Sequence, residues 1–553
     1  MNQVAINSHW EQGYLLFGHG VAASSAIAAL PIFAVLLLLG VFRQAAWIAG
    51  TVGLTIALLV AVTCYRMPPT LAVSSAVYGA AFGLFPISWI ILWALVLFRV
   101  TTETGQFDLI RGSIGRLTKD APLQALLIAF AFGAFIEGAA GFGTPVAIAA
   151  AMLTGLGFSP FRASAICLLA NTAPVAFGSI GIPVITLAGT TGLPLDQLSA
   201  WVGRICTPIA LIIPAYLILA VGGMVALRSA WMPALIAGGV FSLVQLVVSN
   251  MLGPQLTDIL ASLAAIAALF ILCRMGAVKT MSVANENLFR GAEPTASHTS
   301  THASSEHSML RAWMPYCLLV LLVLLWGVKP IQVALNSLSL SFPWPMLHDR
   351  VIRTAPISAT PQPYHAVFLF NWLAASGTSC MMAAVCSALF LRVGAKQFLG
   401  IVLHVLRQIR IPTATVTSVL AMAFLMNYSG AAATLGLAFA ASGALFPFFS
   451  AMLGWLGVFL TGSDTSANAL FGNLQVVTAS RLGISPVLMA AANSVGGTMG
   501  KMISLQTIAV AAAATGMSVS DQARLFRFTL KHSILLAAIA GLVTMLFVYR
   551  VHF

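Results

Sequence analysis

The chain has 553 residues, of which 60% are hydrophobic and only 7% are charged. Soluble proteins carry about 25% charged residues, so this composition excludes an ordinary soluble domain and predicts a polytopic integral membrane protein. The formal net charge is +13, but the Lys and Arg residues stand singly or in small groups at the ends of apolar runs. We interpret this charge as a signal of membrane topology, and we expect no nucleic-acid partner.

The apolar runs predict an all-α fold in the lipid bilayer. A transmembrane helix needs about 20 apolar residues, and the runs leave room for roughly 12 to 14 spans. No Lys or Arg precedes Arg43, whereas Arg99, Arg111, Arg116 and Lys119 follow the third run. The positive-inside rule therefore predicts an N-terminus outside the cytoplasm. The first twenty residues lack the pattern of a removable signal peptide.

One compositional break divides the chain. Residues 276–312 are rich in Ser, Thr, Ala and His, which predicts a flexible polar linker. It separates an N-terminal transmembrane half, residues 1–275, from a C-terminal half, residues 313–553. A second polar segment, residues 329–365, is long enough to form an ordered extramembrane loop.

Metal and cofactor sites are not expected. The linker contains His298, His302 and His307, but their spacing is irregular and no ordered scaffold is predicted around them. The seven cysteines stand singly in apolar segments, without the spacing of zinc or redox sites. We interpret them as small core residues.

The two halves contain a weak repeat. The matches that share one offset are Gly133 with Gly457, Phe135 with Phe459, and Gly138 with Gly462. Downstream, Gly157-Phe-Ser-Pro160 parallels Gly483-Ile-Ser-Pro486, and Thr191-Gly192 parallels Thr515-Gly516. Polar, glycine-interrupted segments at corresponding positions of two halves indicate a transporter binding site.

Glu137 is the only charged residue between Asp120 and Arg162. A charge near a bilayer centre costs roughly 3 kcal/mol or more, so we expect Glu137 to line an ion, proton or substrate path; the alternative is a structural helix cap. The run 122–161 is long enough for a re-entrant hairpin or broken helix, whose free N–H groups suit an anion. Candidate substrate-binding residues in this half are Gly138, Gly141, Gly143, Thr144, Asn171, Thr172 and Ser179.

The second half has an equivalent polar region. Asp464 is the only charged residue between Arg410 and Arg481, and Lys501 is similarly isolated. Two roles are expected for Lys501: it attracts a substrate carboxylate, or it pairs with Asp464 or Glu137. The hydroxyl and amide groups of Thr465, Ser466 and Asn468 could coordinate a cation or bind a substrate hydroxyl. Alternatively, they satisfy the backbone groups at the ends of a broken helix. Candidate residues here are Thr465, Ser466, Asn468, Asn493, Ser494, Lys501 and Gln506.

Four strings resemble the bacterial L-lactate permease family. They are Glu137-Gly-Ala-Ala-Gly-Phe-Gly-Thr-Pro145, Asn171-Thr-Ala-Pro-Val-Ala-Phe-Gly178, Ala375-Ser-Gly-Thr378 and Gly497-Thr-Met-Gly-Lys-Met-Ile-Ser504. The third string adds Thr378 to the candidate substrate-binding residues. The resemblance covers nearly the whole chain. It implies a multi-pass protein of the bacterial cytoplasmic (inner) membrane that imports L-lactate by proton symport, with D-lactate and glycolate as related substrates.

The resemblance also implies a place in a wider group of ion-coupled transporters. That group has inverted repeats, paired re-entrant hairpins, an elevator-like movement and often a homodimer. We expect Glu137 and Asp464 to carry the proton or ion coupling. For Glu137, burial among Phe132, Phe135 and Ile136 favours the neutral, protonated form.

Three other classes of function remain as alternatives. Sodium coupling is one, and a passive transporter or channel for small monocarboxylates is another. An intramembrane enzyme is the third, and we do not expect it. Gly462-Ser-Asp464 lacks a second acidic partner, Gly377-Thr-Ser379 lacks a base, and no HExxH motif occurs.

Overall fold

The structure is a computed structural model that describes residues 9–16, 20–42, 44–115, 117–118, 120–141, 143–275, 306–358 and 360–550. Residues 276–305, most of the expected linker, lie outside the described residues, as do the side chains of its three histidines. Helix α14 begins at Glu306, whereas the sequence placed the start of the second half at residue 313.

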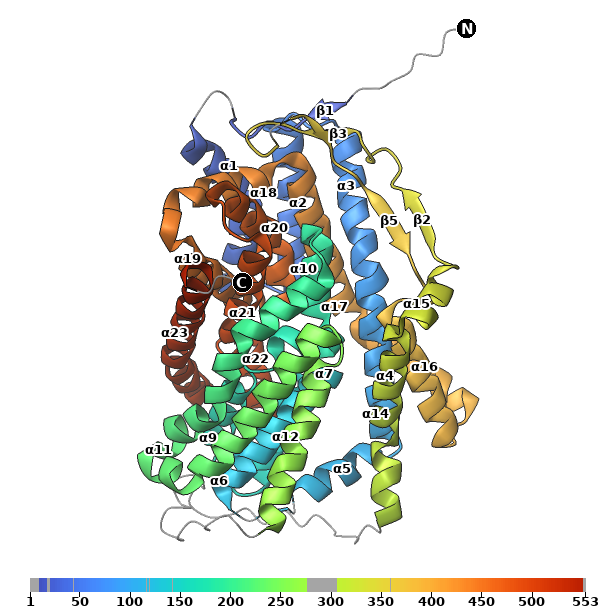
Figure 1. The fold of residues 1–553 in the computed structure, drawn as a ribbon, viewed down its shortest axis with the longest axis vertical. Coiled ribbons are helices and arrows are strands. Elements are labelled where there is room, and N and C mark those ends of the chain that lie inside the picture. The colour runs from blue at the N-terminus through green and yellow to red at the C-terminus, as the bar shows by residue number, and fades with distance from the viewer. Residues whose placement is uncertain are drawn as a thin grey trace.

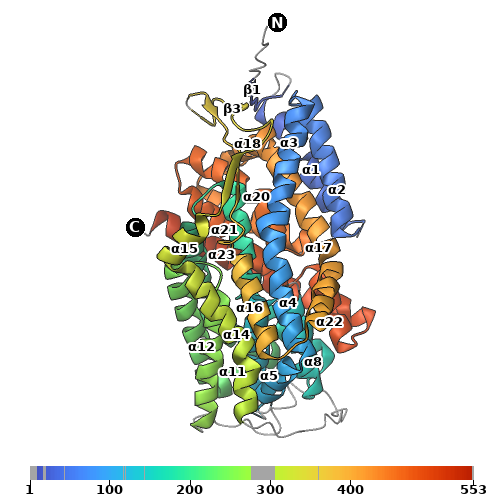
Figure 2. The ribbon, with the colours of Figure 1, turned by 90° about the vertical axis from the view of Figure 1, so that its right-hand side faces the viewer.

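The N-terminal half is almost entirely helical (Figures 1 and 2). Its α-helices are α1 (Val21–Gly40), α2 (Ala46–Thr63), α3 (Pro69–Phe82), α4 (Trp89–Glu103), α5 (Gln106–Gly115), α6 (Ala121–Gln124), α7 (Gly133–Ala139), α8 (Thr144–Gly155), α9 (Pro160–Ala170), α10 (Gly178–Thr191), α11 (Leu195–Met251) and α12 (Thr257–Arg274). Shorter π and 3-10 segments are η1 (Gly83–Ser88), η2 (Ala125–Phe132) and η3 (Val175–Phe177).

The C-terminal half is also helical, with a small strand region before its main bundle. Its helices are α14 (Glu306–Gly327), α15 (Lys329–Asn336), α16 (Ser376–Phe390), α17 (Ala395–Ser429), α18 (Ala431–Phe439), η4 (Ala440–Leu445), α19 (Phe446–Thr461), α20 (Asp464–Leu482), α21 (Pro486–Lys501), α22 (Leu505–Thr515) and α23 (Val519–Tyr549). The strands are β1 (Trp10–Glu11), β2 (Leu340–Pro343), β3 (Val351–Arg353), β4 (Gln362–Pro363) and β5 (Val367–Phe370).

The predicted all-α polytopic fold is confirmed. In the described residues, ten helices are long and apolar enough to cross a membrane, or up to eleven if the bent pair α9 and α10 forms one span. This count is below the expected 12 to 14 because several continuous helical segments are much longer than one crossing.

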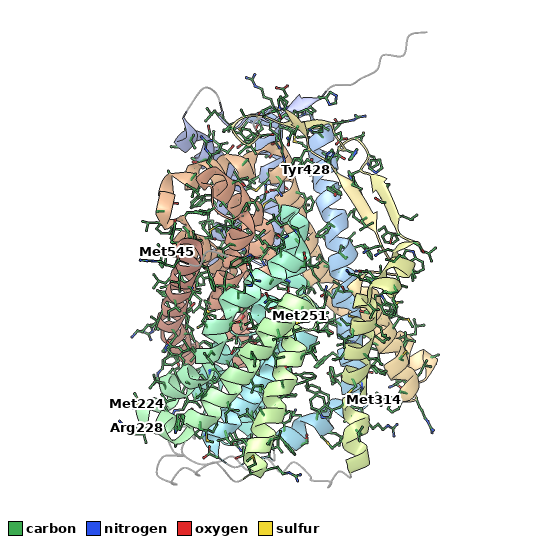
Figure 3. The ribbon with its side chains drawn as sticks, viewed as in Figure 1. Met224, Arg228, Met251, Met314, Tyr428 and Met545 are labelled. Carbon is green, nitrogen blue, oxygen red and sulfur yellow. The ribbon has the colours of Figure 1, made fainter. Side chains whose placement is uncertain are left out.

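Helix α11 is the clearest of these long segments, because it doubles back on itself. Gly223 has φ 69°, a left-handed conformation that glycine adopts without steric cost. Beyond the turn the two arms run together: Ser199 Oγ donates to the Ser249 carbonyl at 2.8 Å. Figure 3 shows Met224 at the turn and Met251 at the far end of the second arm. Each arm is long enough for one span.

Both expected hairpins are present. Positive φ at Gly141 (60°) and Gly143 (80°) lets the chain reverse after α7, and α8 packs back against η2. In the second half, α19 ends at Gly462 in the left-handed conformation (φ 72°), and α20 packs back along α19. The window Ala121–Ala139 is 100% buried, so the first hairpin lies inside the protein.

Local structure follows the sequence repeat beyond the hairpins. Ser159 and Ser485 cap α9 and α21, and each is followed by a proline at the first helical position. Helices α10 and α22 both end at a left-handed glycine, Gly192 and Gly516. The helical run after α9 is interrupted, with a 65° bend between α9 and the helical run that contains α10.

The polar segment 329–365 is ordered and lies on the side of the N-terminus. Strand β1 pairs in parallel with β3, which also pairs with β4, and β2 pairs with β5. Figure 1 shows β1 and β3 at one end of the molecule and α5 at the opposite end. Strands β1 and β3 therefore lie at the end where the described chain begins, whereas β2 and β5 run along the side of the molecule beside α3.

Candidate functional site

Asp464 lies at the tip of the second hairpin, in the first turn of α20. Ser463 caps this helix, with its Oγ accepting from the Ser466 N–H at 3.3 Å. A carboxylate in the first turn interacts favourably with the positive end of the helix dipole. The side chain is only 3% exposed, so its charge must be balanced inside the protein.

A chain of hydrogen bonds joins Asp464 to α21. Ser494 Oγ donates to Asp464 Oδ2 at 2.8 Å, and Asn468 Nδ2 lies 3.4 Å from the same oxygen. Asn493 Nδ2 donates to Asn468 Oδ1 at 2.9 Å, and Gln475 Nε2 donates to Asn493 Oδ1 at 3.0 Å. We call these five residues the C-half cluster. The second carboxylate oxygen of Asp464 has no hydrogen-bond partner among the described residues.

Lys501 lies at the end of α21 and faces the same hairpin tip. Its Nζ donates to the Gly462 carbonyl at 2.9 Å, and the side chain is 9% exposed. Its charge acts on both Asp464 and Glu137. Within the described part of the chain, neither carboxylate forms a direct ion pair with Lys501. The ammonium group therefore interacts electrostatically with both carboxylates without a direct ion pair to either.

Glu137 lies on α7, just before the tip of the first hairpin, whereas Asp464 lies just after the tip of the second. Glu137 is 4% exposed, and its Oε2 has no partner among the described residues. Its Oε1 lies against Gly178, where an added Cβ would be 2.7 Å away. The Asn171 amide lies beside Glu137, yet none of its polar atoms meets hydrogen-bond geometry. Glu137 is thus a buried carboxylate with open hydrogen-bonding capacity.

A left-handed turn adjoins Glu137 at the start of α10. Ser179, Ile180 and Gly181 have φ values of 49°, 59° and 77°. Such a conformation costs non-glycine residues about 1–3 kcal/mol each and is concentrated at functional sites. Ser179 Oγ donates to the Ala140 carbonyl at 3.2 Å, at the tip of the first hairpin. Gly141 packs so closely against Ser179 that an added Cβ would overlap its Oγ.

Asp258 is a third buried carboxylate that we did not predict. It lies on α12, is 1% exposed, and neither of its oxygens has a partner among the described residues. It packs against Gly138, where an added Cβ would be 2.8 Å from the Asp258 Cβ, and its charge interacts with Glu137. Gln245 lies beside it and donates to the Ala173 carbonyl at 3.3 Å. We call Glu137, Asn171, Gln245 and Asp258 the N-half cluster.

The two clusters meet between α10 and α20. Asn468 Nδ2 donates to the Pro183 carbonyl of α10 at 3.2 Å. Cys206 interacts electrostatically with both Asp258 and Asp464. Together with Lys501, these contacts make one site with contributions from both halves.

The hairpin tips give this site its exposed edge. Thr144 begins α8 and Thr465 lies in the first turn of α20; both are partly exposed. Gln506 is exposed, and its side chain lies against Gly462. Gly143 faces Val510, because α22 packs on α8. The tips of both hairpins therefore contact the same helix, α22, which carries Gln506 and Val510.

Two predicted residues make their contacts elsewhere. Thr172 Oγ1 donates to the Leu169 carbonyl at the end of the preceding helix α9, at 2.7 Å. Thr378 on α16 accepts from Trp89 Nε1 at 3.0 Å and donates to the Trp372 carbonyl. Both hydroxyls thus have structural partners outside the two clusters.

A polar pocket of about 270 Å³ lies at the other end of α20. Its walls include two arginines, Arg353 and Arg481, together with polar side chains of the bundle and of the strand region; among these are Gln12, Thr191, Asn427 and Asn473. None of the described residues that line the pocket is acidic. Arg353 stacks over the Tyr364 ring at 3.5 Å from its centroid. This pocket suits an anion.

Comparison with known proteins matches residues 24–551 to a family model described as L-lactate permease. The glycolate permease GlcA of Escherichia coli (strain K12) is 43% identical over 554 residues, which cover 98% of each chain. The L-lactate permease of Bacillus subtilis (strain 168) is 42% identical over 97% of this chain and 98% of its own.

The L-lactate permease of Escherichia coli (strain K12) is 41% identical over 98% of both chains. Among solved structures, MtrF of Neisseria gonorrhoeae is similar with a TM-score of 0.49 and 13% identity, covering 94% of this chain and 97% of that one.

Proposed function

Because the chain belongs to the L-lactate permease family, we propose that it imports L-lactate, and also D-lactate and glycolate, in symport with protons. It is a multi-pass protein of the bacterial cytoplasmic membrane. The names of its relatives support 2-hydroxy monocarboxylates as the substrate class. Secondary active transport, and no enzymatic reaction, is the activity we assign.

The observation that carries proton coupling is the set of three buried carboxylates with an unpaired oxygen, Glu137, Asp258 and Asp464. Each has at least one oxygen without a hydrogen-bond partner in the described structure. Burying an unpaired charge is expensive, and a bound proton removes that charge. Glu137 and Asp258 also repel each other. We therefore assign the coupling proton to this pair, with Asp464 as the second coupling position.

Substrate recognition requires groups for a carboxylate and for a 2-hydroxyl. Lys501 and the N-terminus of α20 supply positive potential at the hairpin tip. The free oxygen of Asp464 accepts from a hydroxyl, and the amide of Asn171 has free donors and an acceptor. A substrate anion next to these carboxylates would be repelled unless a proton is bound, which links the two binding events.

The arginine-lined pocket supports the same substrate class. It lies along α20 from Asp464, toward the end of the molecule that carries the strands. A basic pocket raises the local concentration of anions before they reach a buried site. We assign it as the vestibule from which lactate approaches.

Uptake of labelled L-lactate into proteoliposomes tests the proposal. The purified full-length chain is reconstituted, and an inward pH gradient is imposed without sodium. We expect accumulation above the equilibrium level, which a protonophore abolishes. An excess of unlabelled glycolate should compete.

Two parallel measurements separate the alternatives. Accumulation that requires an inward sodium gradient would reassign Asp464 and its amide neighbours to cation coordination. Uptake that reaches only equilibrium under either gradient would indicate a passive transporter or channel. Empty liposomes with the same gradients serve as the control.

A further inference from the structure

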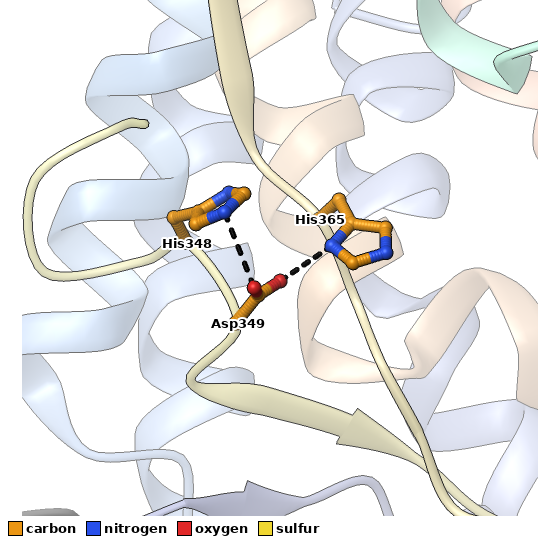
Figure 4. Close-up of side chains that lie close together, drawn as sticks. All are labelled: His348, Asp349 and His365. Carbon is orange, nitrogen blue, oxygen red and sulfur yellow. Dashed lines mark hydrogen bonds and ion pairs between the residues drawn. The ribbon is translucent and has the colours of Figure 1, made fainter. Parts of the chain in front are cut away.

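A histidine and aspartate cluster lies in the strand region, away from the transport site. His348 and Asp349 precede β3, and His365 precedes β5. Figure 4 shows both rings turned toward the carboxylate between them. One ligand atom from each residue lies within 4.8 Å of the others. We propose that these three residues bind one first-row transition-metal ion of the Zn²⁺ class.

The geometry suits a metal centre. His348 Nε2 lies 3.2 Å from Asp349 Oδ2, and His365 Nδ1 lies 2.6 Å from Asp349 Oδ1. Two ligand atoms on a tetrahedral zinc ion are roughly 3.4 Å apart, as metal–ligand distances near 2.1 Å require. Small side-chain rotations therefore bring all three atoms to bonding distance. The fourth position is open to water.

Backbone groups hold the His348 ring in place. Its Nδ1 lies 3.1 Å from both the carbonyl and the N–H of Ala366. When the ring donates from Nδ1 to the carbonyl, Nε2 carries a lone pair that points at a carboxylate. In this tautomer Nε2 is free to bind a metal ion, whereas in the other tautomer Nδ1 accepts from the Ala366 N–H and Nε2 donates to Asp349. A metal-bound histidine usually donates its other ring N–H to a carbonyl or carboxylate, as in the first tautomer.

The backbone of Asp349 provides independent support. Its φ is 58°, in the left-handed region that non-glycine residues rarely adopt. Residues held in this region are concentrated at ligand sites. Two imidazoles and one carboxylate are the donors that zinc, copper, nickel and cobalt prefer, whereas magnesium and calcium prefer oxygen ligands.

A bound metal would close a loop of the chain. The ligands lie at the two ends of residues 348–365, and the segment between them supplies Arg353 and Tyr364 to the wall of the vestibule pocket. A metal at its base restricts this segment, because cross-linking the ends of a loop lowers the entropy of its unfolded forms. The proposed metal thus stabilises one wall of the pocket.

Calorimetric titration of the purified full-length chain with Zn²⁺ tests the proposal, using an affinity tag without histidine. We expect one ion per chain and a higher thermal midpoint with Zn²⁺. His348→Ala and Asp349→Asn should each weaken binding at least tenfold. Asp349→Asn keeps the size of the side chain but removes its charge and replaces one acceptor oxygen with an NH₂ donor. Monodisperse elution of each variant establishes that it is folded.

The linker provides the matched control. A triple variant, His298→Ala, His302→Ala and His307→Ala, removes the other histidine-rich segment and should bind Zn²⁺ as the unaltered chain does. Zinc binding that is lost in this control and kept in His348→Ala would overturn the proposal. So would no Zn²⁺ binding by the unaltered chain, or equal binding of Mg²⁺. None of these results depends on whether lactate is transported.

Discussion

Glu137 and Asp464 are both buried, but their immediate surroundings differ. One carboxylate oxygen of Asp464, Oδ2, accepts hydrogen bonds from Ser494 and Asn468. Glu137 instead faces a glycine, an amide and the second carboxylate, Asp258. Two neighbouring carboxylates in a site of low polarity share a proton readily, since both cannot easily ionise. The N-half cluster is therefore the better proton carrier, and the C-half cluster the better substrate partner.

Glu137→Gln should separate proton coupling from substrate binding. The amide keeps the size of the side chain but cannot exchange a proton. We expect loss of accumulation driven by a pH gradient, while exchange of external labelled for internal unlabelled L-lactate continues. Proteoliposomes under both conditions provide the measurement. Accumulation like that of the unaltered chain, with an unchanged pH profile, would remove Glu137 from the mechanism.

Asp258→Asn extends this prediction to the residue that the sequence did not reveal. If the two carboxylates share the proton, this variant should likewise keep exchange and lose accumulation in the same assay. Full accumulation in Asp258→Asn would assign the proton to Glu137 alone.

Close glycine contacts define the site at the scale of elements. In each half a carboxylate lies against a glycine of a neighbouring helix. Gly178 at the start of α10 faces Glu137, and Gly497 on α21 faces Asp464. These contacts fix how closely α7 approaches α10 and how closely α20 approaches α21. Both carboxylates can shift only if these helices shift with them.

Gly178→Ala and Gly497→Ala should therefore impair transport. The new Cβ atoms would lie 2.7 Å from Glu137 Oε1 and 2.1 Å from Asp464 Oδ1. Forcing such contacts costs about 1–3 kcal/mol, and we expect uptake to fall about two- to tenfold if half of that strain reaches the site. Initial rates of labelled L-lactate uptake, normalised to protein amount, measure this.

Gly239→Ala on α11 is the matched control. The nearest atom outside its own helical turn, Leu211 Cδ1, would be 4.0 Å from the new Cβ, so the methyl group fits. Uptake should stay normal. Equal loss of uptake in all three variants would point to a general packing defect instead of a local effect on the carboxylates.

The vestibule pocket leads to a prediction about substrate affinity. Arg481→Gln removes one positive charge from its wall. A surface charge contributes up to about 1 kcal/mol, so we expect the half-saturating lactate concentration to rise about two- to fivefold with an unchanged maximal rate. Uptake measured over a range of lactate concentrations gives both values.

Arg228→Gln serves as the control for the loss of charge. Arg228 lies near the turn of α11, far from the pocket, and is exposed (Figure 3). The same change in half-saturation for both variants would mean that the effect comes from net charge and not from the pocket.

The elements of the site differ in how visible they are in the sequence. Glu137, Asp464 and Lys501 could be predicted because an isolated charge in an apolar run is costly and conspicuous. Asp258 could not, because it stands near the start of an apolar run, where an acidic residue usually only caps a helix. Its role depends on the packing of α12 against α7. The zinc cluster was missed for a similar reason, since Asp349 and His365 approach only through strand pairing.

For the whole molecule, the distribution of Lys and Arg predicts which end faces the outside. The strand region lies at the end of the described N-terminus, and α5 lies at the opposite end (Figure 1). If the N-terminus is outside, the vestibule and the zinc cluster are outside as well. Lactate would then enter from the strand end.

Cysteine labelling tests this orientation. In a background without the native cysteines, Gln362→Cys on β4 should react with a membrane-impermeant maleimide in intact cells. Gly115→Cys at the end of α5 should react only after the cells are permeabilised. Both positions are at least partly exposed, so access and not burial decides the result. The reverse labelling pattern would invert the topology.

Helix α20 connects the buried site to the vestibule and carries just two charged side chains. Asp464 stands at its first residue and Arg481 near its last. One elementary charge that crosses the membrane potential changes the energy by about 2.3 kcal/mol per 100 mV. Because the two charges of α20 cancel, a displacement of this helix as a rigid body transfers no net charge through the electric field. If one proton accompanies each lactate anion, as we propose, the cargo is neutral too, and we expect uptake to respond to the pH difference and not to the voltage.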